Sequence, residues 1–303
     1  MIAINSCRNK FRAFRSILVS LIFATPCLAF AQAPIATANL SDQFFRMGNG
    51  IGMGGAYRAV ANSPSAVIYN PAGIALMKGK MVASGDYAYI GDVSSHLYGV
   101  AVVDAQTSPV VSYGLSYHRY SPTIGGVSGN VNQTIIAAAY SLGNFLQLGI
   151  SGKGYWVSLD SPILQGPRGL DMDLGAILRP LPILSFAVTG YNLARGGTIE
   201  EFPRMLGFGG ALMLEPHAKL SFDVVNNFNT PSTGKTNYYM GADLRAAEST
   251  YIRGGFAFDN VAHNNYYSVG GALAGPMAEL MFTFSQRLAV KSETYAVSAA
   301  FKF

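Results

Sequence analysis

From Lys80 to the C-terminus, the chain is a series of short segments in which apolar and polar side chains alternate. Gly, Pro, Asn, Asp or Ser residues separate the segments. A period of two is typical of a β-strand with one apolar face. Strands of about ten residues at even spacing are typical of a transmembrane β-barrel, and we count about fourteen of them, an even number as single-chain bacterial barrels require. The segments are 80–90, 95–103, 111–120, 131–141, 145–157, 169–179, 183–193, 204–214, 217–225, 236–245, 249–258, 265–274, 277–287 and 293–303.

The composition also indicates a membrane protein. Hydrophobic residues make up 50% of the chain and charged residues only 12%, whereas soluble domains carry about 25% charged residues. After Ala31, no apolar run approaches the roughly 18 residues that a membrane helix needs. Because only helices and closed barrels satisfy every backbone group in lipid, the sequence predicts an all-β fold, a transmembrane antiparallel barrel over residues 80–303.

The alternation also predicts which side of each strand meets lipid and which meets the lumen. In segment 236–245, Tyr238, Met240 and Leu244 share the face expected to meet lipid, and Tyr239 and Gly241 lie on the other face. Charged side chains of both signs fall on the inner faces of several strands. These predicted lumen charges are Asp171, Asp173, Asp243, Arg245 and Arg253.

The connections and the last strand predict the orientation. Tight turns alternate with longer loops rich in turn residues, a pattern that places both termini in the periplasm. The last strand has an apolar face that includes Tyr295, Phe301 and the terminal Phe303. This face resembles the C-terminal signal of outer-membrane proteins, which implies the barrel-assembly machinery as a partner and the outer-membrane lipids as the surroundings.

The N-terminus is typical of a secretory signal peptide. Four basic residues precede a short apolar stretch, which ends in the small-residue pattern Ala29-Phe30-Ala31. We expect cleavage after Ala31, so that residues 1–31 are removed. A lipoprotein acylated at Cys27 is the alternative, and Pro26 beside the cysteine disfavours it.

Removal of the signal peptide changes the chemistry of the mature chain. Both cysteines, Cys7 and Cys27, lie in the removed segment, so no disulfide or cysteine-based metal site is expected. The segment also holds four of the 21 Lys and Arg residues and none of the 16 Asp and Glu residues, so the formal charge falls from +5 to +1. A partner of the nucleic-acid class is therefore not expected.

Residues 32–79 do not alternate and are too apolar for a linker. We predict that they form a plug inside the lumen, where their apolar side chains are covered. Gly50, Gly52 and Gly55 also fit the dinucleotide-binding spacing G-x-G-x-x-G. That interpretation requires a buried strand before the glycines and an acidic residue about 20 positions later. The chain has "SDQFFRM" before them and Tyr69, Asn70 and Pro71 at the later position.

Two motifs in this segment resemble the N-terminal hatch of the FadL/TodX superfamily, the outer-membrane transporters of long-chain fatty acids and aromatic hydrocarbons, and of its smaller PorV-like relatives. In that superfamily a G-M-G-G-A motif and a following N-P-A-G motif lie in a small plug inside a fourteen-stranded barrel. The resemblance implies a hatch over residues 32–79 that acts as a gate. The matching residues are Gly52, Met53, Gly54, Gly55, Ala56, Asn70, Pro71, Ala72 and Gly73.

Two functions are compatible with a barrel that contains such a hatch, and neither is enzymatic. The first is passive uptake of hydrophobic small molecules, fatty-acid-like or hydrocarbon-like, gated by the hatch. The alternative is a non-transporting scaffold or shuttle barrel, PorV-like, whose partner is a secretion or envelope protein; the short outer loops favour it. A general ion-conducting porin is disfavoured by the plug.

Catalytic signals are weak. The chain has no G-x-S-x-G or H-E-x-x-H motif, and its four histidines are scattered singly. Asp171 and Asp173 share a face about 7 Å apart, as in some glycosidases, but lumen charges balanced by basic residues on neighbouring strands explain them better. We therefore expect no catalytic residue, no cofactor and no metal.

Overall fold

A computed structural model describes residues 47–91, 94–124, 127–160, 168–194, 196–197, 203–228, 236–261 and 263–303. The predicted signal peptide and the first part of the predicted hatch, residues 32–46, lie outside these ranges. The proposed domain boundaries therefore stay predictions.

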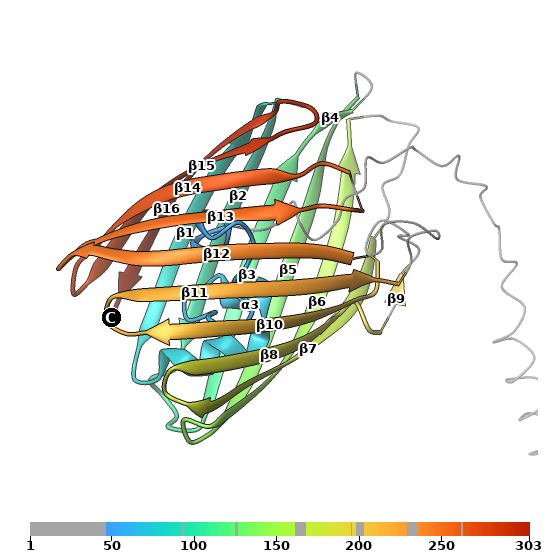
Figure 1. The fold of residues 1–303 in the computed structure, drawn as a ribbon. Coiled ribbons are helices and arrows are strands. Elements are labelled where there is room, and N and C mark those ends of the chain that lie inside the picture. The colour runs from blue at the N-terminus through green and yellow to red at the C-terminus, as the bar shows by residue number, and fades with distance from the viewer. Residues whose placement is uncertain are drawn as a thin grey trace, which may run out of the picture. The chain divides into compact units, whose positions relative to one another are not determined.

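The wall is a closed antiparallel barrel of fourteen strands, as the sequence predicts (Figure 1). The ring closes because β1 pairs with β16 and β3 pairs with β5. Two further strands of two residues each extend the ladder, β4 (Thr123–Ile124) beside β5 and β9 (Gly196–Gly197) beside β7. The wall strands are β1 (Met81–Ile90), β2 (Ser95–Asp104), β3 (Val111–Ser121), β5 (Val127–Leu142), β6 (Leu146–Leu159), β7 (Arg168–Leu181), β8 (Leu184–Tyr191), β10 (Met205–Leu214), β11 (Ala218–Asn227), β12 (Thr236–Ala247), β13 (Thr250–Phe258), β14 (Tyr266–Ala274), β15 (Ala278–Arg287) and β16 (Glu293–Lys302).

The two faces of the wall differ as the alternation predicts. In β12, Tyr238, Met240 and Leu244 are exposed on the outside, whereas Tyr239 and Asp243 are buried on the inside. The same division recurs around the ring, so a band of exposed Leu, Val, Ile, Phe and Tyr side chains surrounds a more polar interior. An apolar exterior with a polar interior is the inverse of a soluble protein and is typical of a barrel in lipid.

The predicted strand bounds differ most from the structure at β5. The alternation predicts 131–141, whereas the strand spans Val127–Leu142. Ser128, Gly129 and Asn130 lack an apolar face, but the backbone ladder continues through them, with Gly129 opposite Leu159 of β6. Backbone pairing with β6 therefore extends the strand past the residues in which apolar and polar side chains alternate.

Short helices lie within residues 47–79, which we call the hatch from here on: α2 (Asn49–Gly52), α3 (Ala66–Tyr69) and the 3₁₀ helix η2 (Pro71–Met77). Pro71 occupies the first turn of η2, where its missing N–H costs nothing. In Figure 1 the hatch, drawn in blue and cyan, lies inside the ring of strands. Among the described residues, no helix is both long and apolar enough to cross a membrane.

If the exposed apolar band faces lipid, the cost of a charged substitution in it should depend on the depth of the residue in the membrane. Phe222 lies in the middle of β11 and points outward, and Leu214 points outward at the end of β10. We expect Phe222→Arg to lower the free energy of unfolding in lipid vesicles by about 2–4 kcal/mol, and Leu214→Arg to lower it by about 0–1 kcal/mol. Denaturant titration in vesicles measures both, and equal losses would contradict the lipid-facing assignment.

Candidate functional site

The hatch fills part of the lumen and is almost entirely buried. Val67, Tyr69, Ala72 and Ile74 have 0–1% of their surface exposed. They belong to an apolar cluster that also contains inward-facing wall residues such as Ile135 of β5 and Ile177 of β7. The apolar side chains of the hatch are thus covered by the wall, as the sequence requires.

Glycines on the inner face of the wall make room for the hatch. At each of eight wall glycines, an added Cβ would press against a hatch residue. At Gly207, for example, it would lie 2.7 Å from Arg58 Nε. Real Cβ atoms do not approach so closely, so the backbone or side chains of the hatch pack directly against the backbone of the wall at these positions. The eight are Gly99, Gly114, Gly149, Gly175, Gly207, Gly209, Gly241 and Gly255.

The first motif, Gly52 to Ala56, lies against β12 and β13. Met53 packs on Gly241 and Gly255 of these strands. Gly54 has φ +63° and Gly55 φ +90°, and a Cβ on Gly54 would lie 2.6 Å from the backbone nitrogen of Phe256. Both glycines therefore occupy a conformation unfavourable to other residues, and Gly54 in addition has no room for a side chain.

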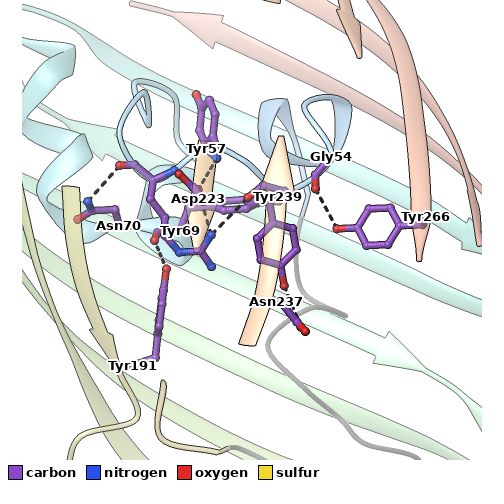
Figure 2. Close-up of polar contacts among 11 residues, drawn as sticks. Gly54, Tyr57, Tyr69, Asn70, Tyr191, Asp223, Asn237, Tyr239 and Tyr266 are labelled. Atoms are coloured by element: carbon purple, nitrogen blue, oxygen red, sulfur yellow. Dashed lines mark hydrogen bonds and ion pairs between the residues drawn. The ribbon is translucent and has the colours of Figure 1, made fainter. Parts of the chain in front are cut away.

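Two wall side chains hold this motif by its carbonyl groups. The Tyr266 hydroxyl donates to the Gly54 carbonyl at 3.1 Å, and the Ser268 hydroxyl donates to the Gly52 carbonyl at 3.3 Å. Figure 2 shows Tyr266 reaching Gly54 from the wall.

The second motif, Asn70 to Gly73, forms the turn into η2. Asn70 Oδ1 accepts from the Ala72 amide at 3.1 Å, which caps the helix. Its Nδ2 lies 3.1 Å from the Arg58 carbonyl and 3.4 Å from the Ala176 carbonyl of β7. This one side-chain amide therefore joins the second motif to Arg58, two residues beyond the first motif, and to the wall. At Gly73 a Cβ would meet Ala61, so the turn also packs tightly within the hatch.

A buried ion pair joins the hatch to β11. Asp223 Oδ2 accepts from the Tyr57 amide at 2.9 Å, from the Arg58 amide at 3.0 Å and from Arg58 Nη1 at 3.1 Å. The two side chains are 2% and 0% exposed. The sequence prediction did not include this pair among its site residues. The available signal was that Arg58 is the only charged residue between Met47 and Met77, because a lone charge in an apolar segment needs a buried partner.

Aromatic rings surround the Arg58 guanidinium. Its Cζ lies 5.4 Å from the ring centre of Tyr191 and 5.5 Å from that of Tyr239, distances that permit cation–π attraction. The Tyr191 hydroxyl also donates to the Tyr69 carbonyl of the hatch. Figure 2 shows these tyrosines around Asp223.

Tyr57 packs inside the hatch against Tyr69, edge to face at 5.5 Å. Its hydroxyl lies 3.0 Å from Ser63 Oγ and accepts from the Asn62 amide at 3.2 Å. Burial raises the pKa of the Tyr57 phenol to about 12. The phenol is therefore neutral over the working pH range, and serves packing instead of proton transfer.

The predicted lumen charges are satisfied within the wall. Lys153 of β6 pairs with Asp173 of β7 at 2.9 Å. Arg253 of β13 lies 3.2 Å from Asp243 of β12 and 3.0 Å from Glu279 of β15.

The remaining two predicted charges bind backbone groups. Asp171 accepts from the Ala194 amide at 2.9 Å. Arg245 donates to the Glu248 carbonyl in the turn after β12, so the structure places it at the barrel rim. Within the described ranges, no group of three or more His, Cys, Asp or Glu residues could hold a metal ion.

The residues of the predicted assembly signal lie on the outer face of the last strand. Tyr295, Phe301 and Phe303 are all exposed there, Phe303 by 75%. The Phe303 amide donates to the Met81 carbonyl at 2.9 Å, which places the C-terminus beside the start of β1. These residues do not contact the hatch site, so any role of theirs is separate from it.

Comparison with solved structures finds the same fold in hydrocarbon channels. The CymD monoaromatic hydrocarbon channel superposes with a TM-score of 0.65 at 13% identity, over 84% of this chain and 96% of that one. The toluene transporter TbuX of Ralstonia pickettii gives 0.61 at 15% identity, over 84% and 96%. A FadL homologue of Pseudomonas aeruginosa gives 0.62 at 11% identity, over 84% and 98%. No protein-family model and no curated protein sequence matched the chain. The chain thus has the fold of the FadL/TodX-type hydrocarbon transporters.

The packing of Gly54 yields a prediction with a matched control. Gly79 has a similar φ of +73° but no atom within 4 Å of an added Cβ. An alanine at either position meets the same backbone strain of about 1–2 kcal/mol, and only Gly54→Ala also collides with β13. We expect hydrogen exchange of the hatch amides to speed up by about tenfold or more in Gly54→Ala relative to Gly79→Ala. Equal exchange in the two variants would show that the hatch does not depend on this contact.

Proposed function

We propose that the protein is an outer-membrane channel for passive uptake of hydrophobic small molecules, fatty-acid-like or hydrocarbon-like, and that the hatch is its gate. The observation that supports this most directly is the hatch itself, buried in the lumen of a barrel whose outer face is apolar. Any movement of the hatch changes the space that a solute in the lumen can occupy. The fold shared with named hydrocarbon channels supports the cargo class, because it spans most of this chain and nearly all of theirs.

An apolar cargo suits the chemistry of the lumen. A second apolar cluster forms where Met47 of the hatch packs against inward-facing residues of the wall on β1, β2, β3, β5, β6 and β16, which include Leu97, Tyr120, Val131 and Tyr155. Apolar molecules gain free energy by leaving water for such a surface or for lipid. Transfer down a concentration gradient therefore needs no energy source.

The proposed location is the bacterial outer membrane, with the mature chain starting near Gln32 and both termini in the periplasm. The exposed apolar band supports contact with outer-membrane lipids. The apolar face of β16 supports recognition by the barrel-assembly machinery through Tyr295, Phe301 and Phe303.

One observation favours the alternative, a non-transporting scaffold barrel that binds a secretion or envelope protein. The connections at the rim opposite the C-terminus are short where the structure describes them, such as residues 288–292 between β15 and β16. Short connections provide few residues from which a deep binding site outside the membrane could be built. The two functions differ in a measurable property, which is flux through the pure protein.

Flux measurements with the purified protein in vesicles test the proposal. The vesicles need an outer leaflet of lipopolysaccharide, because apolar molecules enter an ordinary phospholipid bilayer unaided. We expect radiolabelled toluene to equilibrate several-fold faster than in protein-free vesicles of the same composition, without accumulation beyond the amount that partitions into the lipid. A protonophore should not change the rate, because no energy source is involved. A rate equal to that of protein-free vesicles, together with capture of an envelope protein by the barrel in native membranes, would favour the scaffold function instead.

Deletion of Phe303 tests the assembly signal. The side chain lies on the lipid-facing side and supports no hatch contact, so we expect reduced outer-membrane levels in cells but unchanged unfolding of the protein once assembled. Quantitative blotting of boiled and unboiled membrane fractions measures the folded amount. Phe145→Ala, which removes another exposed aromatic side chain far from the C-terminus, is the control. Equal levels in the two variants would argue against the signal.

A further inference from the structure

We propose that the Arg58–Asp223 ion pair is the latch of the hatch: it holds the gate closed while both ions are dry, and it releases when water reaches them. This inference rests on the proposed gating function and names the contact that regulates it.

The pair is placed where a latch must be. Asp223 belongs to the wall, and one of its oxygens binds three donors of the hatch, the Tyr57 and Arg58 amides and the Arg58 side chain. Among the ion pairs between described residues, it is the one that connects hatch and wall. The pairs of Lys153 and of Arg253 join wall strands to each other. Loss of the Arg58–Asp223 contact therefore loosens the hatch without breaking the strand ladder.

The chemistry of the pair suits a contact that has to open. A buried ion pair stabilises a closed state weakly, because the cost of removing two ions from water nearly cancels their attraction. An apolar pair of similar volume often holds as well or better. When the hatch moves and water enters, both ions recover their hydration, whereas an apolar pair would lose its burial. The ion pair thus holds the closed hatch in one specific position, and its separation costs little free energy.

The two tyrosines help to keep the closed pair dry. Tyr191 and Tyr239 cover the guanidinium at cation–π distance, which replaces part of the hydration that Arg58 loses. Tyr191 also binds the hatch through the Tyr69 carbonyl. Displacement of the hatch therefore removes this cover from Arg58 as it removes the ion pair.

Another side of the hatch offers room for water. A cavity of about 60 Å³ lies between the hatch and β1, β15 and β16. Its lining combines apolar surface with polar side chains, which include Asn62 and Ser65 of the hatch and Ser84, Asp86 and Ser298 of the wall. A cavity of this size with several polar partners has room for a water molecule. Hydration of the hatch boundary can therefore begin there, away from the latch on β11.

Two variants test the latch because they should act in opposite directions. Asp223→Asn keeps an oxygen for the two backbone amides but leaves the Arg58 cation buried without a counter-ion. Such a stranded charge is strongly unfavourable, so the hatch should leave its seat. We expect ion conductance in planar bilayers, and exchange of the hatch amides, to rise by about tenfold or more.

The double variant Arg58→Met with Asp223→Asn removes both charges and keeps the acceptor for the backbone amides. Methionine packs well against the two tyrosine rings. Without the two charges, opening of the hatch no longer gains the free energy of hydrating two ions. We expect hatch exchange at or below the wild-type rate and toluene flux reduced at least severalfold. Wild-type flux in this double variant would overturn the latch, because the charges would then have no part in opening.

Asp173→Asn is the matched control, since it breaks a buried ion pair inside the wall. It should leave the hatch exchange unchanged, and heat-modifiable mobility on gels verifies that every variant forms its barrel. If Asp223→Asn matches wild type in exchange and conductance, the latch is wrong even where wild type transports toluene. If wild type passes no toluene but Asp223→Asn opens an ion conductance, the latch stands and the transport function fails.

Discussion

Closure of the backbone ladder is the constraint on which the rest of this structure depends. The pairing of β1 with β16 removes the two sheet edges that an open sheet would expose, and in lipid an unpaired backbone group costs several kcal/mol. Once the ring is closed, alternate side chains have to face outward or inward. The outward set becomes apolar and the inward set forms a lumen that water, ions or another part of the chain has to fill. The hatch fills part of that space in this protein.

Wall and hatch are stabilised by different interactions, and this difference permits a gate. The wall is held by hydrogen bonds from strand to strand, which no hatch movement disturbs. The hatch is held by side-chain contacts to backbone carbonyls, by apolar burial and by the Arg58–Asp223 pair. These contacts are individually modest. A segment with this kind of attachment can move while the barrel around it keeps its full ladder.

Glycine placement explains how a barrel of this size accommodates a folded segment. The inner wall has glycines where the hatch passes closest, such as Gly149 beside Ala72 and Gly241 beside Met53. A side chain at those positions would hold the hatch away and open gaps around it. Part of the high glycine content, 34 residues in the chain, is thus explained by the contact surface between hatch and wall. Gly54 and Gly55 contribute to the same contact from the side of the hatch.

The sequence by itself determined the barrel, its strands and the face that each strand presents, because alternation with a period of two is a local property that any strand in lipid has to obey. The turn at Asn70 is also local, because the Asn70 side-chain oxygen accepts from the Ala72 amide two residues away. The sequence could not predict that Arg58 pairs with Asp223, since the two are 165 positions apart. Many inward acidic residues were equally available to Arg58 from the pattern alone. The inward glycines were visible as letters, but only the tertiary structure showed which of them face the hatch, because that depends on how the hatch is rotated and seated within the closed ring.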